Sequence, residues 1–92
     1  MKAKIEQLKN LGPQSAKMLA LVGIDELEQL RCIGSVGAYL EVKLSGQKAS
    51  LNLLYAIHAG LQGRHWTSLS ASEKESLQIE LDEQASIRQL LG

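Results

Sequence analysis

The chain has 92 residues, the length of one domain. It contains no Phe, and aromatic residues make up only 3% of the sequence. A core of Leu, Ile, Val, Ala and Met favours helices over a sheet. Ten Lys and Arg balance ten Asp and Glu, which argues against a dedicated nucleic-acid binder with its clustered cations.

Two apolar stripes at helical spacing flank a Gly-Pro corner near the N-terminus: Ile5, Leu8 and Leu11 before it, and Met18, Leu19 and Val22 after it. Gly12 can adopt backbone conformations closed to other residues, and Pro13 suits the first turn of a helix. The pattern predicts a helix-hairpin-helix with the second helix ending at Gly23. The first amides of that second helix would point outward, which is a typical anion site.

Asp25 and Glu28 have the spacing of a capping box and predict a helix that ends at Gly34. Its inward residues are expected to be Leu27, Leu30 and Ile33, and Cys32 is expected to be a small core residue near its end. Ser35 is a plausible cap for the next helix, which runs to residue 44.

Ser50 begins the most apolar segment, which ends at Gly63. Apolar residues on nearly every face predict a central helix surrounded by others. His58 in this helix is either a buried polar group with a specific partner or a surface side chain. We expect Tyr39 and Tyr55 to bury their rings and to hydrogen-bond through their hydroxyls.

Ser70 and Glu73 form another capping-box pattern and open a charged last helix. The tail over residues 82–92 either extends that helix or forms a separate one. No segment alternates with period two, so no strand is expected. The sequence predicts a single compact all-α domain of five or six helices over residues 1–92, with a helix-hairpin-helix or SAM-like fold.

The first candidate site is the hairpin loop, where DNA-binding examples resemble Gly-x-Gly-Pro-Lys-x-Ala. Asn10 can replace the first glycine because asparagine tolerates the left-handed region, but neutral Gln14 stands at the cation position. The candidate nucleic-acid contacts are Lys9, Asn10, Gly12, Gln14, Ser15 and Lys17. The alternative interpretation is that the corner only turns the chain, and the zero net charge favours it.

The second candidate site consists of two partner-binding segments. Arg64, His65 and Trp66 fit an interface because Trp and Arg are common anchors. The alternative, which we favour because the only Trp of a small helical domain usually packs inside, is that Trp66 closes one end of the core while Arg64 or His65 caps helix carbonyls. Ile87, Leu90 and Leu91 are apolar residues beyond the predicted core, so the tail either folds back or docks on a second copy as a homodimer.

No catalytic, metal-binding or cofactor-binding constellation is recognisable, so we expect a protein that is not an enzyme and has no small-molecule substrate. One cysteine excludes an internal disulfide. No apolar run reaches the roughly 18 residues of a membrane span, and no signal peptide is recognisable. We expect no membrane partner and a soluble, cytoplasmic protein.

The order of these signals resembles the C-terminal domain of the TfoX/Sxy competence regulators over residues 5–82. The motifs that carry the resemblance are Leu11-Gly12-Pro13-x-Ser15-Ala16, Val22-Gly23-Ile24, Ile33-Gly34, Leu51-Asn52-Leu53-Leu54-Tyr55-Ala56 and Gly63-Arg64-His65-Trp66. The resemblance implies a SAM-like helical fold in bacterial proteins linked to competence-gene regulation. Full-length members carry a preceding α/β domain, so this chain corresponds to a stand-alone member or to a domain cut from a longer protein. We expect an interaction module that acts through protein–protein contacts, with weak, sequence-independent DNA binding as the alternative.

Overall fold

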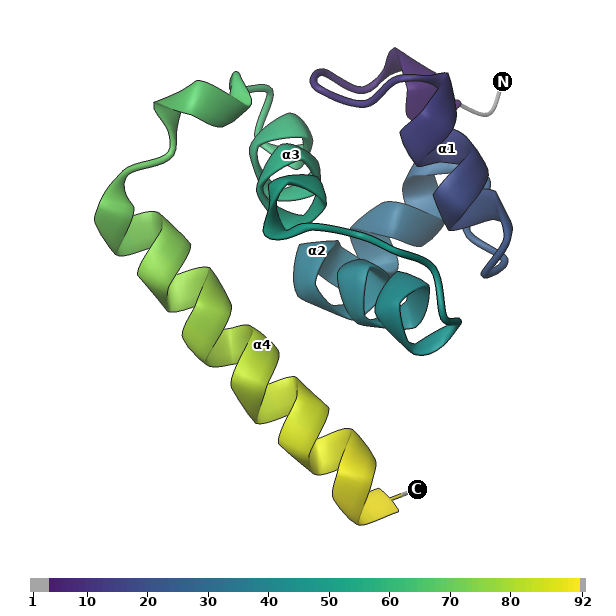
Figure 1. Ribbon diagram of the computed structural model, residues 1–92. Helices are drawn as coiled ribbons and strands as arrows, with labels where there is room; N and C mark the ends of the chain where they lie inside the picture. Colours follow the sequence, from purple (N-terminus) through teal and green to yellow (C-terminus); the bar gives the residue numbers. More distant parts are fainter. Residues whose placement is uncertain (1–3, 92) are drawn as a thin grey trace.

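The computed structural model describes residues 4–91, and over that range the regular structure is helical. Its elements are η1 (Ile5–Gln7), α1 (Pro13–Ala20), α2 (Leu27–Leu44), α3 (Leu51–Leu61), η2 (Trp66–Ser68) and α4 (Ala71–Leu91), where η marks a single turn of 3₁₀ helix (Figure 1). The all-α prediction is therefore confirmed.

The helix expected over residues 5–11 is replaced by η1, so residues 4–91 contain four α-helices rather than five or six. After η1 the chain is extended at Leu8, with φ −75° and ψ 139°, and Asn10 has a left-handed φ of +74°. A continuous helix cannot contain these conformations. With only a 3₁₀ turn and no α-helix before the Gly-Pro corner in the described residues, the helix-hairpin-helix and SAM-like assignments are not confirmed.

The α2 helix is interrupted at Gly34, whose φ of +84° and ψ of 166° lie outside the helical range. The break falls where the sequence predicted one helix to end and the next to begin. Before the break Leu30 is buried, but Cys32 and Ile33 are exposed. The expected core positions of these two residues are wrong, and for Cys32 the reason is that two residues rotate a helix by about 200°, away from the Leu30 side.

The predicted capping boxes are confirmed for α4 and shifted by one residue for α2. The Ser70 amide donates to Glu73 Oε1 at 3.0 Å, and the Glu73 amide donates to Ser70 Oγ at 3.1 Å. At α2 the side-chain oxygen of Gln29 accepts from the amides of Asp25 and Glu26, so Glu26 is the N-cap. The reach of Gln29 over both amides explains the shift from the predicted Asp25–Glu28 pair.

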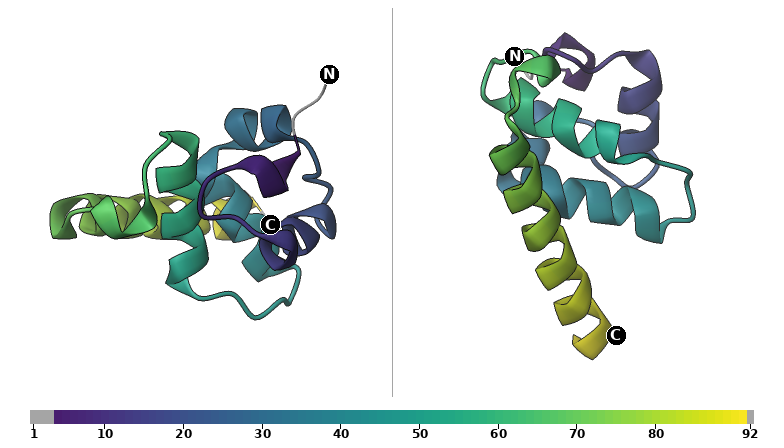
Figure 2. Two further views of the ribbon diagram at one scale, coloured as in Figure 1. Left: turned by 90° about the horizontal axis from the view of Figure 1, so that it is seen from above. Right: turned by 60° about the vertical axis from the view of Figure 1, so that its left-hand side comes forward.

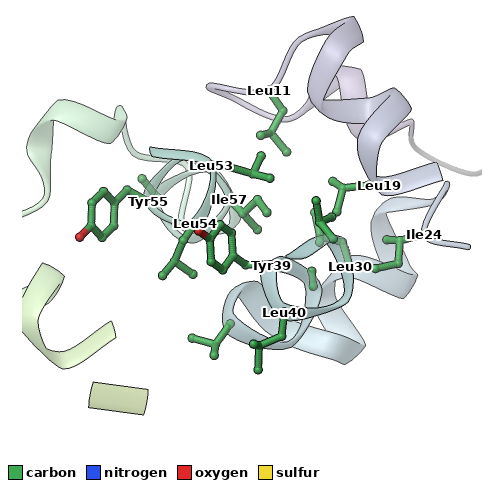
Figure 3. Close-up of a cluster of buried hydrophobic side chains, with 14 of the residues drawn as sticks. Leu11, Leu19, Ile24, Leu30, Tyr39, Leu40, Leu53, Leu54, Tyr55 and Ile57 are labelled. Atoms are coloured by element: carbon green, nitrogen blue, oxygen red, sulfur yellow. The ribbon is translucent and has the colours of Figure 1, made fainter. Parts of the chain in front are cut away.

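The core lies between α3 and the second half of α2, with α1 and the N-terminal loop covering one side (Figure 3). Leu54 and Ile57 of α3 are fully buried, which agrees with the predicted central position of this helix. The Tyr39 hydroxyl donates to Ala49 O at 3.2 Å, and the Tyr55 hydroxyl accepts from Gln78 at 2.7 Å. Both tyrosines therefore behave as the sequence predicted.

The α4 helix packs along α2, and its C-terminal end projects beyond the other helices (Figure 2). Leu77 is buried, while Leu81 and Ala85 pack half-buried against the core. The predicted tail segment continues α4 to Leu91 rather than forming a separate helix; Gly92 lies outside the described residues. No helix within residues 4–91 is both long and apolar enough to cross a membrane.

Candidate interaction surfaces

The side chain of Asn10 joins the N-terminal loop to the loop that follows α3. Its amide nitrogen donates to Arg64 O at 2.8 Å and to Ala56 O at 3.5 Å, and its oxygen accepts from the Trp66 amide at 3.1 Å. The sequence correctly allowed Asn10 a left-handed conformation. Its side-chain hydrogen bonds are made inside the domain, so they are not free for a phosphate.

Arg64 forms a two-pronged ion pair with Glu73 at the start of α4. Its Nη1 lies 2.6 Å from Glu73 Oε2, and its Nη2 lies 3.0 Å from Glu73 Oε1. The guanidinium also donates to Ser68 O, Ser68 Oγ and Gln62 Oε1. Arg64 therefore connects the end of α3 to η2 and α4, and little of its hydrogen-bonding capacity remains for a partner.

This ion pair determines the acid–base behaviour of Glu73. The hydrogen bond from the Arg64 side chain is the largest cause that lowers the pKa of Glu73 to about 2, followed by the hydrogen bond from the Ser70 amide. The same pairing raises the pKa of Arg64. Glu73 therefore stays ionised throughout the neutral range and keeps both its cap and its ion pair.

A cleft of about 380 Å³ lies between the first turn of α1, the first turn of α3 and η2. Trp66, 38% exposed, lies at this cleft, as do Gln14 and Ser15 of α1, together with Lys48. The remaining lining residues are Asn10, Met18, Ala49, Ser50, Asn52, Leu53 and Ala56. The expectation that Trp66 packs inside and closes the core is therefore wrong. Its indole instead forms part of a polar and apolar cleft.

The six predicted nucleic-acid residues do not line one common cleft. Asn10, Gln14 and Ser15 line the Trp66 cleft, whereas Lys17 lines a different hollow with Pro13. Lys9 is exposed and lines neither. Gly12 is extended, with φ −110° and ψ −170°, so its backbone does not require glycine. The cation that the structure does place in the cleft, Lys48, was not predicted because it is distant in sequence.

The predicted partner residues separate into two surfaces. His65 stacks near Trp66, with ring centroids 6.4 Å apart, at the cleft end of the domain. Ile87, Leu90 and Leu91 lie at the far end of α4, roughly 30 Å along the helix from its start at 1.5 Å per residue. The segments 64–66 and 87–91 therefore belong to two separate surfaces, one beside the cleft and one at the end of α4.

The outward face of α4 carries four exposed apolar side chains, of which the sequence analysis identified three. Leu90 and Leu91 are 87% and 84% exposed, and Ile87 is 54% exposed. Ile79, at 52% exposed, extends this face toward the middle of the helix. Ile79 and Ile87 are eight residues apart, about two helical turns, and this spacing could have indicated from the sequence that Ile79 lies on the same face of α4.

His58 is a half-buried polar group with a specific partner, the first of the two alternatives. Its Nδ1 lies 3.3 Å from Ser35 Oγ, beside the break in α2. Hollows on both sides of His58 also contain Glu80. Among residues 4–91 no group of three or more His, Cys, Asp or Glu side chains is arranged to hold a metal ion.

Comparison with known proteins identifies a family match over most of the chain. Residues 1–81 match the family described as the TfoX C-terminal domain. The chain is 35% identical over 80 residues to a protein named DNA transformation protein TfoX from Haemophilus influenzae. That alignment covers 87% of this chain and 37% of the relative, so the chain spans little more than a third of the relative's length.

A solved structure has a similar fold. The crystal structure of an uncharacterized protein from Listeria monocytogenes superposes with a TM-score of 0.76 at 28% sequence identity. The match covers 83% of this chain and 86% of the other. The arrangement of helices described above is thus shared with a bacterial protein of known structure.

Proposed function

Because the chain belongs to the TfoX C-terminal domain family, we propose that it is a non-enzymatic protein-binding module that contributes to the regulation of bacterial competence. The relative's printed name concerns DNA transformation, which gives the process. The outward face of α4 is the single observation that supports protein binding. Small soluble proteins rarely leave large apolar side chains grouped on one exposed face unless a partner covers them.

The presentation of this face supports the proposal. The α4 helix is fixed to the domain by the ion pair of Arg64 with Glu73, by buried Leu77 and by the ion pair of Arg88 with Glu41 at 2.7 Å. A helix held on one side presents its other side in a fixed geometry, which reduces the entropy cost of binding.

The test replaces the matching region of the Haemophilus influenzae protein with this chain and measures transformation frequency. We expect the chimera to support transformation and Ile87→Ser with Leu90→Ser to lower the frequency at least about tenfold. The matched control is Leu21→Ser with Leu44→Ser, which removes two exposed leucines outside α4. A chimera without activity, or equal loss in both double variants, contradicts the proposal.

The Trp66 cleft favours a second candidate function, weak and sequence-independent DNA binding. The first-turn amides of α1 and α3 lack intrahelical acceptors, and Lys48 adds a cation beside them. Trp66 could stack on a base in single-stranded DNA. The net charge of zero limits the affinity, because few counterions would be released.

Fluorescence anisotropy with single-stranded and duplex DNA over a salt series tests this second function. Each phosphate contact would add roughly 0.7 to 0.9 to the slope of log affinity against log salt. Lys48→Glu is expected to abolish binding. Lys17→Glu, which makes the same charge change outside the cleft, is expected to retain most of it. Equal loss in the two variants would exclude the cleft as the DNA site.

A further inference from the structure

The outward face of α4 combines apolar side chains with carboxylates. Glu83 lies between Ile79 and Ile87 on this side of the helix, because positions 79, 83, 87 and 90 follow the helical repeat. Glu75, Glu80 and Asp82 flank the stripe and are exposed. Within residues 4–91, none of these four acidic side chains has an ion pair or hydrogen bond.

The two cations of α4 are turned toward the body of the domain. Lys74 lies over the ring of Tyr55, with its Nζ 5.3 Å from the ring centroid. Arg88 is paired with Glu41 of α2. The outward face therefore has an acidic charge that no cation of its own helix balances.

A second copy of the same face is a poor partner for this surface. In a parallel two-fold pairing of α4 with α4, Glu83 would lie level with the Glu83 of the other copy. In an antiparallel pairing about Leu81, the middle of α4, the two Glu83 positions would lie only about 6 Å apart along the helix axis. Like charges brought together at an interface cost free energy and suppress the pairing. Charge complementarity thus selects a partner of opposite sign.

We propose that the outward face of α4 binds a basic amphipathic helix of another protein, an inference that rests on the proposed function above and specifies its partner. Ile79, Ile87 and Leu90 would contact the apolar stripe of that helix. The carboxylates at the flanks would pair with its Lys and Arg, as charged flanking positions do in coiled coils.

The test uses synthetic peptides of three heptads with the whole 92-residue protein. One peptide has Leu at the a and d positions and Lys elsewhere, a second has Glu in place of Lys, and a third has the Leu and Lys residues in scrambled order. Anisotropy of the labelled peptides measures the affinity. We expect the ordered Leu/Lys peptide to bind at least about tenfold more tightly than either of the others.

Charge reversal provides the sharper result. Glu80→Lys with Glu83→Lys should lower the affinity for the Leu/Lys peptide at least about tenfold. The same double variant should bind the Leu/Glu peptide. The matched control is Glu6→Lys with Glu28→Lys, which changes the net charge equally on η1 and on the first turn of α2 and should preserve the original preference. Circular dichroism verifies that each variant keeps its helix content.

Equal binding of the three peptides, or equal effects of the two charge reversals, overturns the inference. Analytical ultracentrifugation of the protein without peptide measures whether it forms a homodimer. A wild-type dimer that Ile87→Ser with Leu90→Ser dissociates would show that a second copy occupies the face. If the chimera above depends on Ile87 and Leu90 while the peptides show no preference, the proposed function stands and the basic partner is wrong.

Discussion

At the scale of single residues, the polar side chains of the candidate sites mostly serve the interior of the domain. Asn10 makes hydrogen bonds with the backbone of α3 and of the loop after it. Arg64 is held by Glu73 and Ser68. Asn and Arg are common in binding sites, but here these two side chains connect elements that are distant in sequence. Through the hydrogen bond to the Trp66 amide, Asn10 also helps to position the exposed indole.

Asn10→Ala is expected to lower the free energy of unfolding by about 2 kcal/mol, because it leaves two half-buried carbonyl groups and the Trp66 amide without their partner and strains a left-handed residue. Asn10→Gly keeps the backbone conformation without strain and should cost about 1 kcal/mol less. Urea denaturation of both variants gives the comparison. Equal stability of the two variants would mean that the φ of +74° is not maintained in solution.

Glu73 gives the domain a defined response to acid. Its pKa in the folded protein is about 2, below the ordinary value of 4.5, so its stabilising contribution is fully present above pH 4.5 and is lost as the pH falls toward 2. Glu73→Gln should therefore lower the melting temperature at pH 7, with the difference from wild type shrinking between pH 4.5 and 2. A difference independent of pH would contradict the ionised Arg64–Glu73 pair.

At the scale of elements, the sequence predicted what depends on neighbouring residues. The cap of α4 at Ser70 and Glu73, the glycine that ends α3 and the break at Gly34 all depend on residues within one or two turns. Residues 5–11 have a helical apolar pattern, but the hydrogen bonds of Asn10 to residues 46 to 56 positions away hold them in a loop. Such long-range contacts leave no local signal in the sequence.

The α3 helix depends on the absence of a side chain at Gly60. A Cβ there would collide with the backbone oxygen of Lys9 and lie 3.1 Å from Leu8 Cγ. Gly60→Ala should destabilise the protein by about 1–3 kcal/mol in spite of the better helix propensity of alanine. Gly12→Ala meets no heavy atom within 4 Å and should cost only about 0.5 kcal/mol at its N-cap position. Thermal denaturation distinguishes the two, and a neutral Gly60→Ala would contradict the close contact between the N-terminal loop and α3.

At the scale of the whole molecule, the domain has a cleft beside Trp66 and an acidic, apolar outward face on α4. The C-terminal end of α4 projects beyond the other helices (Figure 2). The sequence analysis identified one residue or more of each surface, Trp66 at the cleft and Ile87 on α4. It could not identify Lys48 or the acidic flank of α4, because both depend on how the helices are placed. The separation of the surfaces allows each to be altered without the other.

A chain that ends at Glu83 provides a whole-molecule test of the projecting end of α4. It loses Ala85 from the core edge and the exposed ion pair of Arg88 with Glu41, so it should be less stable by only about 1 kcal/mol. Light scattering should find both versions monomeric, because the acidic faces of two copies repel each other. A dimer of the full chain that the shortened chain does not form would instead support self-association through this end.

The hydrogen bonds of Asn10 also imply an order in which the parts of the domain separate. They close a loop of more than fifty residues. The entropy cost of closing that loop is offset only when the contacts of packed α2 and α3 are in place. We expect the N-terminal loop to join last during folding and to separate first during brief openings of the native state. The Trp66 amide should then exchange its hydrogen faster than the amides of α3. We therefore expect a partner to remodel the Trp66 cleft without unfolding α2 and α3.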